Sequence, residues 1–223
     1  MKLLLIGMGP GIGLSVARQF GREGFEILMI GREMDKMRVF EQELRSAGIP
    51  ATGYAQDIAD EQAYHRLLGQ IAGEHPDIDI LHYNASAFNP ALPSEMALPV
   101  FKDDLQINVT GALMAVQTFF PHFKARGNGT MFFTGGSTAL HAPANLFSLG
   151  IGKAAMRNLS LALTEECAPY GVRVATLTIW GMVRPNTAND PNLIAGEFWR
   201  IYNLPDKAWQ PEVMWGQEFS DGF

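Results

Sequence analysis

The strongest constraint on the fold is an alternation of short apolar runs with helix-length amphipathic stretches. The apolar runs lie at 2–7, 26–31, 49–55, 78–84, 129–135 and 172–180. Most of them are continuously apolar, as in "KLLLIG" and "EILMIG", which is typical of parallel strands covered on both faces. The helical candidates between them lie at about 11–23, 34–47, 60–74, 100–125 and 148–169. This order predicts a doubly wound parallel sheet with right-handed crossovers and helices on both faces.

The last part of the chain differs in character, because it is rich in Trp, Phe and Pro. We expect a helix near 190–203 and a final short strand near 211–215, which brings the sheet to about seven strands. A length of 223 residues suits one domain with a sizeable core. The sequence therefore predicts a single Rossmann-type domain over residues 1–223.

Composition excludes several classes of partner. A net charge of -6, with no long run of basic residues, argues against nucleic acid or an anionic membrane surface. No stretch reaches the apolar length of a membrane span, and the first residues do not resemble a signal peptide. A lone cysteine, Cys167, cannot form an internal disulfide, and the five histidines show no metal-ligand spacing with it. We therefore expect a cytoplasmic protein that binds no metal.

A glycine-rich loop follows the first apolar run and opens the first helix. In "LLLIGMGPGIGLSVARQF", Gly7, Gly11 and Gly13 allow a tight turn and a close backbone approach, and Gly9 adds room. The amides at a helix N-terminus then face the anion. A plain strand-to-helix turn would also use glycine, but this loop has the strand–loop–helix context that dinucleotide binding requires. The loop predicts a pyrophosphate site.

The end of the second strand indicates which dinucleotide binds. An NAD site usually has an acidic residue there, which holds the ribose 2′-hydroxyl. This chain has Gly31, which leaves space, and then Arg32, whose planar cation can fork onto a 2′-phosphate. The neighbouring Glu33 argues the other way. We expect NADP(H) rather than NAD(H).

Four further stretches make a family resemblance visible: "HYNAS" (82–86), "INVTGA" (107–112), "TGGSTA" (134–139) and "GKAA" (152–155). Together with the spaced glycines, and in this order, they resemble the short-chain dehydrogenase/reductase family over roughly residues 1–185. The resemblance implies an NAD(P)-dependent oxidoreductase that acts on a carbonyl or alcohol. It also implies a small-molecule substrate and a homodimer or homotetramer formed through the helices that contain Asn108 and Lys153.

The resemblance also implies individual roles at the cofactor. The glycine loop with Ile12 would hold the pyrophosphate, and Asp57 with Ile58 would touch the adenine. Asn84 and Ala85 match the segment that follows the fourth strand in this family. Gly181 matches the glycine of a Pro-Gly pair whose backbone contacts the nicotinamide carboxamide. The residues implied in cofactor binding are Gly7, Gly11, Ile12, Gly13, Arg32, Asp57, Ile58, Asn84, Ala85, Lys153 and Gly181.

Three residues match catalytic positions of the family. Asn108 matches the asparagine that kinks its helix and organises a proton-relay water. Ser137 matches the serine that polarises the substrate carbonyl, and Lys153 matches the lysine that holds the nicotinamide ribose. Leu149 stands four residues before that lysine, where the family has its catalytic tyrosine. Ser148 is adjacent in sequence but lies on a different face of the helix.

The leucine leaves two functions open. Reduction of a carbonyl produces an alkoxide that needs a proton donor, and leucine has no proton to donate. In one interpretation the protein is an enzyme in which Lys153, with Asn108, passes the proton through ribose and water. In the other it is a non-catalytic NADP(H)-binding sensor or partner subunit. Residues 186–223 are expected to form a reduced substrate lid and the C-terminal segment of the same domain.

Overall fold

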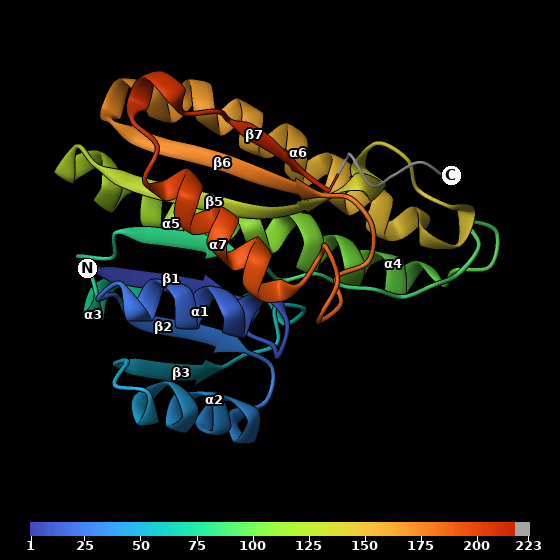
Figure 1. The fold of residues 1–223 in the computed structure, drawn as a ribbon. Helices are drawn as coiled ribbons and strands as arrows, with labels where there is room; N and C mark the ends of the chain where they lie inside the picture. The colour runs from blue at the N-terminus through green and yellow to red at the C-terminus, as the bar shows by residue number, and fades with distance from the viewer. Residues whose placement is uncertain (217–223) are drawn as a thin grey trace.

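The computed structural model describes residues 1–216, which build one sheet of seven parallel strands in the order β3-β2-β1-β4-β5-β6-β7 (Figure 1). All six neighbouring pairs are parallel. The strands are β1 (Lys2–Ile6), β2 (Glu26–Gly31), β3 (Ala51–Ala55), β4 (Ile80–Tyr83), β5 (Gly129–Gly136), β6 (Val172–Ile179) and β7 (Glu212–Trp215). The predicted doubly wound fold is confirmed.

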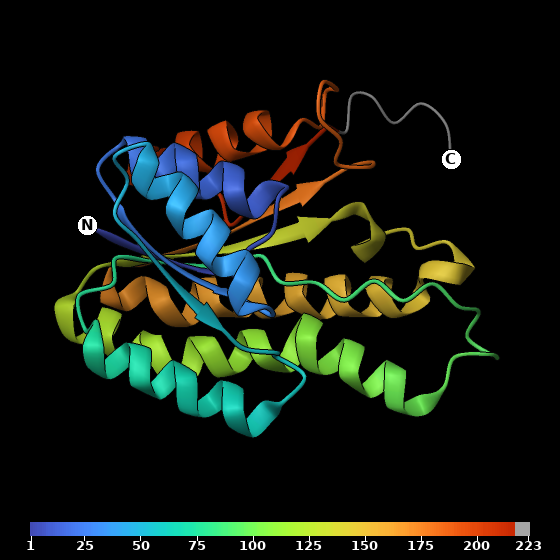
Figure 2. The same cartoon turned by 90° about the horizontal axis from the view of Figure 1, so that it is seen from below.

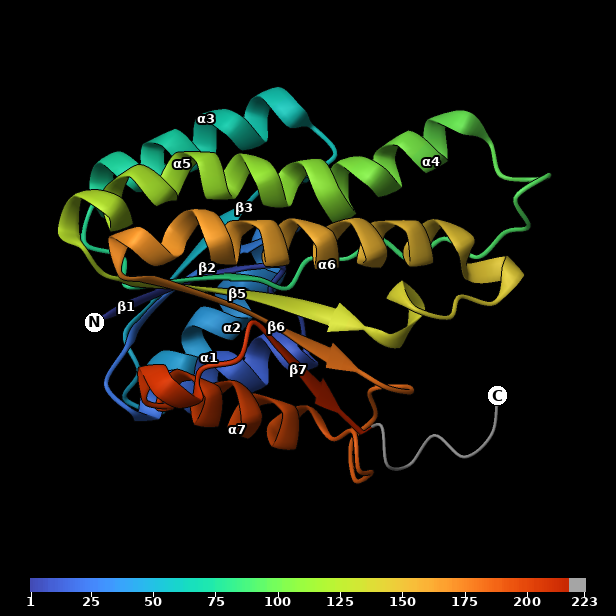
Figure 3. The same ribbon diagram turned by 90° about the horizontal axis from the view of Figure 1, so that it is seen from above.

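Helices cover both faces of the sheet (Figures 2 and 3). One face carries α1 (Ile12–Arg22), α2 (Met34–Ser46) and α7 (Pro191–Tyr202). The other carries α3 (Glu61–Glu74), α4 (Leu98–Leu105), α5 (Gly111–Arg126) and α6 (Phe147–Cys167). Within residues 1–216, no helix is both long enough and apolar enough to cross a bilayer.

The first strand shows why its residues are continuously apolar. Leu4 and Ile6 belong to the core that packs under α3, α5 and α6, whereas Leu3 and Leu5 belong to the core under α1 and α7. All four side chains are fully buried, because successive residues of a strand point to opposite faces of the sheet. A strand between two helical layers therefore has no solvated face.

The boundaries of the third strand and of the helix expected at 100–125 differ from the predicted ones. The third strand begins at Ala51 rather than at residue 49, because the Ile49 N–H bonds to the Leu44 carbonyl and closes the end of α2. Gly48, in the left-handed region at φ 78°, makes that turn possible. The helix expected at 100–125 covers 98–126 and contains a π-helical segment at Gln106–Thr110. Asn108 lies in this π segment, at the irregularity that the family resemblance implies.

Strand order reverses between β1 and β4, since β2 and β3 follow on one side and β5, β6 and β7 on the other. In open α/β sheets this reversal leaves a crevice beyond the carboxyl ends of the strands, and ligands bind there. The loops after β1 and β4 border that crevice. The topology therefore directs attention to the glycine loop and to the segment that begins at Asn84.

His82 on β4 makes the fold sensitive to acid. Its side chain is fully buried, and burial lowers its pKa from 6.5 to about 3. The unfolded chain takes up a proton on this histidine near pH 6.5, and the folded chain does not. His82 therefore costs no stability above pH 6.5, and the free energy of unfolding falls as the pH drops from 6.5 toward 3. Between pH 6.5 and 5 this loss is about 2 kcal/mol for one group.

We therefore expect the His82→Gln variant, which does not titrate, to lose less stability than the unmodified protein when pH falls from 7 to 5. Urea unfolding at both pH values measures the difference, which should be about 2 kcal/mol. Equal losses in the two proteins would show that His82 is not held neutral by the fold.

Candidate functional site

The glycine loop after β1 is pressed against the loop after β4. Gly7 has φ +95°, and a Cβ atom there would collide with the backbone nitrogen of Ala85. A Cβ on Gly13 would lie 3.1 Å from the Gly7 carbonyl oxygen, so α1 also starts close to the loop. Gly9 and Gly11, in contrast, face open space, with no atom within 4 Å of an added Cβ. The first pair of glycines permits packing, and the second pair leaves room for a ligand.

The start of α1 fits a phosphate group. Its N-cap is Gly11, no side chain caps the helix, and the first turn holds no acidic residue. A helix N-terminus in this state presents free N–H groups and the positive end of the helix dipole. Open space at Gly9 and Gly11 lets an anion reach these groups. The loop therefore fits the pyrophosphate of a dinucleotide.

Two cavities along the carboxyl edge of the sheet contain most of the predicted cofactor residues. The first, of about 420 Å³, is lined by residues that include Gly7, Arg32, Asp57, Ile58 and Ala85. The second, of about 470 Å³, is lined by residues that include Gly11, Ile12, Ser137, Leu149, Lys153 and Gly181. Asn84 and Ser86 line both cavities, which therefore adjoin. The first cavity is suited to one end of an elongated ligand and the second cavity to its other end. Gly13 lines neither cavity and acts in packing.

Gly31 lines the first cavity, next to Arg32. The place that a Cβ would take there is filled by the Met37 side chain, whose sulfur would lie 2.8 Å away. That Gly31 leaves space for a 2′-phosphate stays a prediction. Arg32 is exposed and lines the cavity. Glu33 forms an ion pair with Lys36 at 2.6 Å, one helical turn on. The carboxylate of Glu33 therefore points to Lys36 on the protein surface.

A buried polar network joins the ends of three strands. The Asn84 amide donates to the Gly7 carbonyl at 2.9 Å, and its oxygen accepts from the Thr134 hydroxyl at 2.9 Å. The same hydroxyl lies 2.9 Å from Nε2 of His82. Because Thr134 uses its proton on Asn84, it accepts from His82, which therefore carries its proton on Nε2. The network fixes β1, β4 and β5 relative to one another beneath the cavities.

Lys153 reaches this network from α6. Its Nζ donates to the Thr134 carbonyl at 2.7 Å, and the side chain is only 7% exposed. Burial lowers its pKa from 10.5 to about 8, since desolvation disfavours the charged form. Lys153 shares the second cavity with Ser137, which follows β5. The structure thus brings two of the three predicted catalytic residues together.

Leu149 lines the same cavity, one turn before Lys153 on α6. Ser148 does not, because its hydroxyl is buried on another face of the helix and donates to Asp104 Oδ2 at 2.6 Å. The expectation that Ser148 lies on a different face is confirmed. At position 149 the cavity wall is therefore apolar.

Asn108 lies apart from both cavities. Its side chain is fully buried, its Oδ1 accepts from the Ala87 N–H at 2.8 Å, and its Nδ2 donates to the Ala87 carbonyl at 3.4 Å. Neither cavity has Asn108 in its lining. The amide is committed to the loop after β4, so it holds that loop in place. A direct proton-relay role for this residue stays a prediction.

Sequence reasoning missed the residues that support the site. Thr134 and His82 lie within the quoted motifs "TGGSTA" and "HYNAS", but no role was assigned to either. Asp104 was also missed: it is buried in α4 and accepts from Asn89 and Ser148, both at 2.6 Å. Asp104 lies four positions before Asn108, and residues at this spacing share a helix face. This spacing is the sequence signal that could have identified Asp104.

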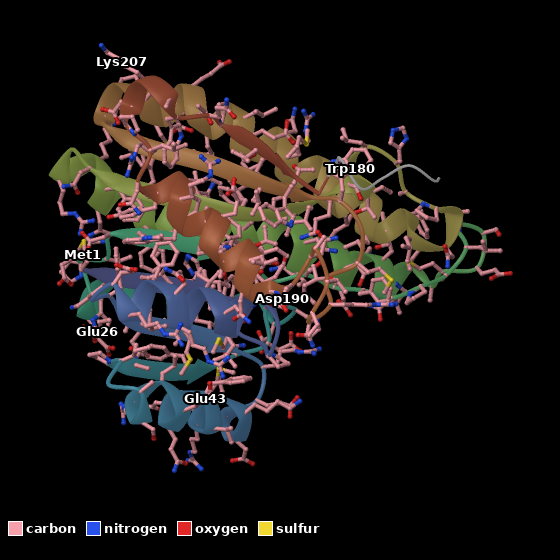
Figure 4. The ribbon with its side chains drawn as sticks, in the orientation of Figure 1. Met1, Glu26, Glu43, Trp180, Asp190 and Lys207 are labelled. Atoms are coloured by element: carbon pink, nitrogen blue, oxygen red, sulfur yellow. The ribbon has the colours of Figure 1, made fainter. Side chains whose placement is uncertain are left out.

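The loop between β6 and α7 closes the far side of the second cavity. It runs from Trp180 to Asp190, which Figure 4 labels, and it is held by the Asn189 amide, which donates to the Trp180 carbonyl at 2.6 Å. The segment 186–223, predicted to form a reduced lid and the C-terminal part of the domain, begins in this loop. Residues 217–223 of that segment lie outside the described part of the chain. Among residues 1–216, no group of three His, Cys, Asp or Glu side chains is placed to hold a metal ion.

This fold, with a phosphate-ready helix and an edge crevice, defines an α/β protein of the dinucleotide-binding Rossmann type. Sequence comparison then gives the family: the profile described as "short chain dehydrogenase" matches residues 2–192. The chain belongs to the short-chain dehydrogenase family.

Curated relatives agree with this assignment. The serine 3-dehydrogenase of Agrobacterium fabrum is 31% identical over 180 residues, which cover 78% of this chain and 69% of that protein. Dehydrogenase/reductase SDR family member 4 of Sus scrofa is 26% identical over 185 residues, covering 82% of this chain and 66% of that protein. The chain spans about two thirds of the length of these relatives.

Solved structures agree on the fold. A metagenomic short-chain oxidoreductase in complex with NADP has a TM-score of 0.87 at 21% identity, covering 96% of this chain and 95% of that one. A short-chain dehydrogenase from Rhodopseudomonas palustris has a TM-score of 0.85 at 23% identity, covering 96% of both chains. At these identities the likeness shows the fold alone.

Lys153 should lower stability near neutral pH. The folded state holds it near pKa 8 and the unfolded state near 10.5, so the destabilisation is complete below pH 8 and disappears as pH rises to 10.5. Between pH 7 and 9.5, the unmodified protein should gain about 2 kcal/mol relative to the Lys153→Met variant. Urea unfolding of both proteins at the two pH values checks this, and a constant difference would contradict it.

Proposed function

We propose that the protein is an NADP(H)-dependent oxidoreductase that interconverts a small carbonyl compound and its alcohol. The observation that carries the proposal is the second cavity, in which Ser137, Leu149 and Lys153 meet beside the glycine loop. Membership of a dehydrogenase family and the dehydrogenase names of the curated relatives support it.

When bound, the dinucleotide supplies or accepts the hydride. The start of α1 would bind its pyrophosphate, Asp57 and Ile58 would contact its adenine, and Lys153 would bind its nicotinamide ribose. The Ser137 hydroxyl donates a hydrogen bond to the substrate oxygen and stabilises the negative charge that develops there. Among the described residues that line the second cavity, Lys153 is the only charged one. With a pKa of about 8 it is mostly protonated at pH 7, and it holds the proton that the alkoxide requires.

The second candidate is a non-catalytic NADP(H)-binding sensor or partner subunit. Leu149 favours it, because the cavity has no hydroxyl at this position. Ser137 favours the enzyme, since a protein that only binds the dinucleotide has no evident need for a hydroxyl at the substrate position. We place the enzyme first, and the substitution of Leu149 separates the two.

The proposed assembly is a homodimer or homotetramer formed through α5 and α6. Leu113 on α5 and Ile151 on α6 support this proposal, because they are 38% and 44% exposed. Apolar side chains in the centre of an interface would lose this exposure.

Arg32 should determine the choice of cofactor. The protein is expected to bind NADPH more tightly than NADH, and Arg32→Ala should reduce that preference about tenfold, or about 1.4 kcal/mol, because one charged contact to the 2′-phosphate is lost. Fluorescence titration with both cofactors measures it. Arg38→Ala is the matched control, since Arg38 is also exposed and lies next to Asp35 rather than the first cavity. Equal affinities of the unmodified protein for NADPH and NADH would contradict the assignment of NADP(H) as its cofactor.

Leu149→Tyr should test the active site directly. If the cavity needs only a proton donor, the new phenol lies one turn from Lys153, whose positive charge lowers the phenol pKa. Reduction of a simple aldehyde should then rise by up to about 10²–10⁴ where proton transfer limits the rate. Steady-state kinetics with NADPH gives the change.

Leu149→Phe is the control, because it adds the same ring without the hydroxyl. A gain in the tyrosine variant alone supports a site that lacks only its acid. A loss in both variants supports a site rebuilt around leucine. If both variants fold and bind NADPH but reduce none of a broad panel of carbonyl compounds, the non-catalytic function takes first place.

A further inference from the structure

We infer that the second cavity selects an uncharged, apolar carbonyl compound, whose hydrocarbon part lies against Leu149, Ile179 and Val183. This inference rests on the proposed function and adds to it the chemical class of the substrate.

The wall of the cavity is apolar on three elements. Leu149 comes from α6, Ile179 from the end of β6, and Val183 from the loop that follows. The polar side chains of the lining come from the segment after β4, from β5 and the turn after it, and from α6; they are Asn84, Ser86, Thr134, Ser137, Thr138 and Lys153. A substrate whose oxygen lies next to Ser137 makes apolar contacts where its hydrocarbon part meets Leu149, Ile179 and Val183. Burial of each methylene group there is worth about 0.8 kcal/mol.

Two exposed apolar residues adjoin the lining along the chain. Met182 lies between the lining residues Gly181 and Val183 and is 70% exposed. Leu140 closes the turn that carries Ser137, with its N–H bonded to the Ser137 carbonyl at 2.9 Å, and it is 41% exposed. Exposed apolar side chains next to a pocket are common at binding sites for apolar ligands.

Charge argues in the same direction. The lining of the second cavity contains no carboxylate among the described residues, and its one cation, Lys153, already bonds to the Thr134 carbonyl. In the proposed function Lys153 serves the nicotinamide ribose and the reacting oxygen, so a carboxylate at the far end of the substrate's hydrocarbon part would lose its hydration without gaining a partner, which is costly. Arg184 is the nearest basic residue along the loop, but it is exposed, lies outside the lining and contacts the Met182 sulfur. An amino acid substrate, as in the names of the serine 3-dehydrogenase relatives, is therefore not favoured here.

The test measures binding rather than turnover. Butanamide, hexanamide and octanamide are unreactive analogues of carbonyl substrates, and they are titrated calorimetrically with and without saturating NADP⁺. Affinity should rise about fourfold for each added methylene, which is the factor that corresponds to full burial. The ω-carboxylate of the six-carbon amide should bind at least tenfold more weakly than hexanamide.

Variants assign the effect to the wall. Leu149→Asn keeps the size of the side chain but makes it polar, so it should flatten the dependence on chain length. Leu98→Asn is the control, because Leu98 is exposed on α4 and lies outside the lining of both cavities. Arg184→Gln should leave the penalty for the carboxylate unchanged, and thermal melting shows whether each variant folds.

A flat dependence on chain length, a carboxylate that binds as well as hexanamide, or no amide binding at all would overturn the inference. The proposed function and the proposed substrate class are contradicted by different results. If the amides show the expected dependence but no aldehyde or ketone is reduced with NADPH, the substrate class stands and catalysis does not. If carbonyl compounds are reduced without regard to chain length or charge, catalysis stands and the substrate class does not.

Discussion

The hydrogen bonds of the Asn84 side chain hold the site together. One bond reaches the Gly7 carbonyl after β1 and the other the Thr134 hydroxyl on β5, across the position where strand order reverses. The β1–β4 ladder and the bond from the Asn84 N–H to the Ile6 carbonyl keep the two halves in register, and the side-chain bonds of Asn84 fix the segments beyond the ladder. His82 and Lys153 extend the network by bonding to Thr134. Both cavities therefore depend on a few buried polar contacts, in which an unpaired partner would be costly.

The same apolar surroundings have two chemical consequences at the second cavity. Burial lowers the pKa of Lys153 to about 8, which places its proton within reach of physiological pH. The leucine at position 149, with Ile179 and Val183, gives a substrate apolar contacts in the same cavity. A site of this kind depends on one buried lysine for its charge and on hydrocarbon for its selectivity. Stability is reduced in exchange, because a charged lysine is desolvated in the folded protein.

Asn108 shows what a sequence motif predicts about a residue and what it does not. The family resemblance placed it correctly at an irregularity of its helix, and the π segment at Gln106–Thr110 is that irregularity. The direction of its amide is a separate matter, because it depends on Ala87, which is 21 residues away and lies in another loop. Gly31 is similar: it lines the first cavity, but the place that a Cβ would take is filled by Met37 from the next helix. Motifs identify positions, whereas packing partners decide what each side chain faces.

The sequence by itself determined the order and type of the elements, the glycine loop at the start of α1, and the positions of Ser137, Leu149 and Lys153 along the chain. These features follow from local periodicity and from residue types next to one another, which one segment encodes without its neighbours. Only the tertiary structure decided that Leu149 and Lys153 share one cavity with Ser137, and that Asp104 is the partner of Ser148. It also decided the pKa of Lys153. The physical reason is that burial, and each of these contacts, depends on atoms contributed by distant segments, whose mutual approach no local pattern records.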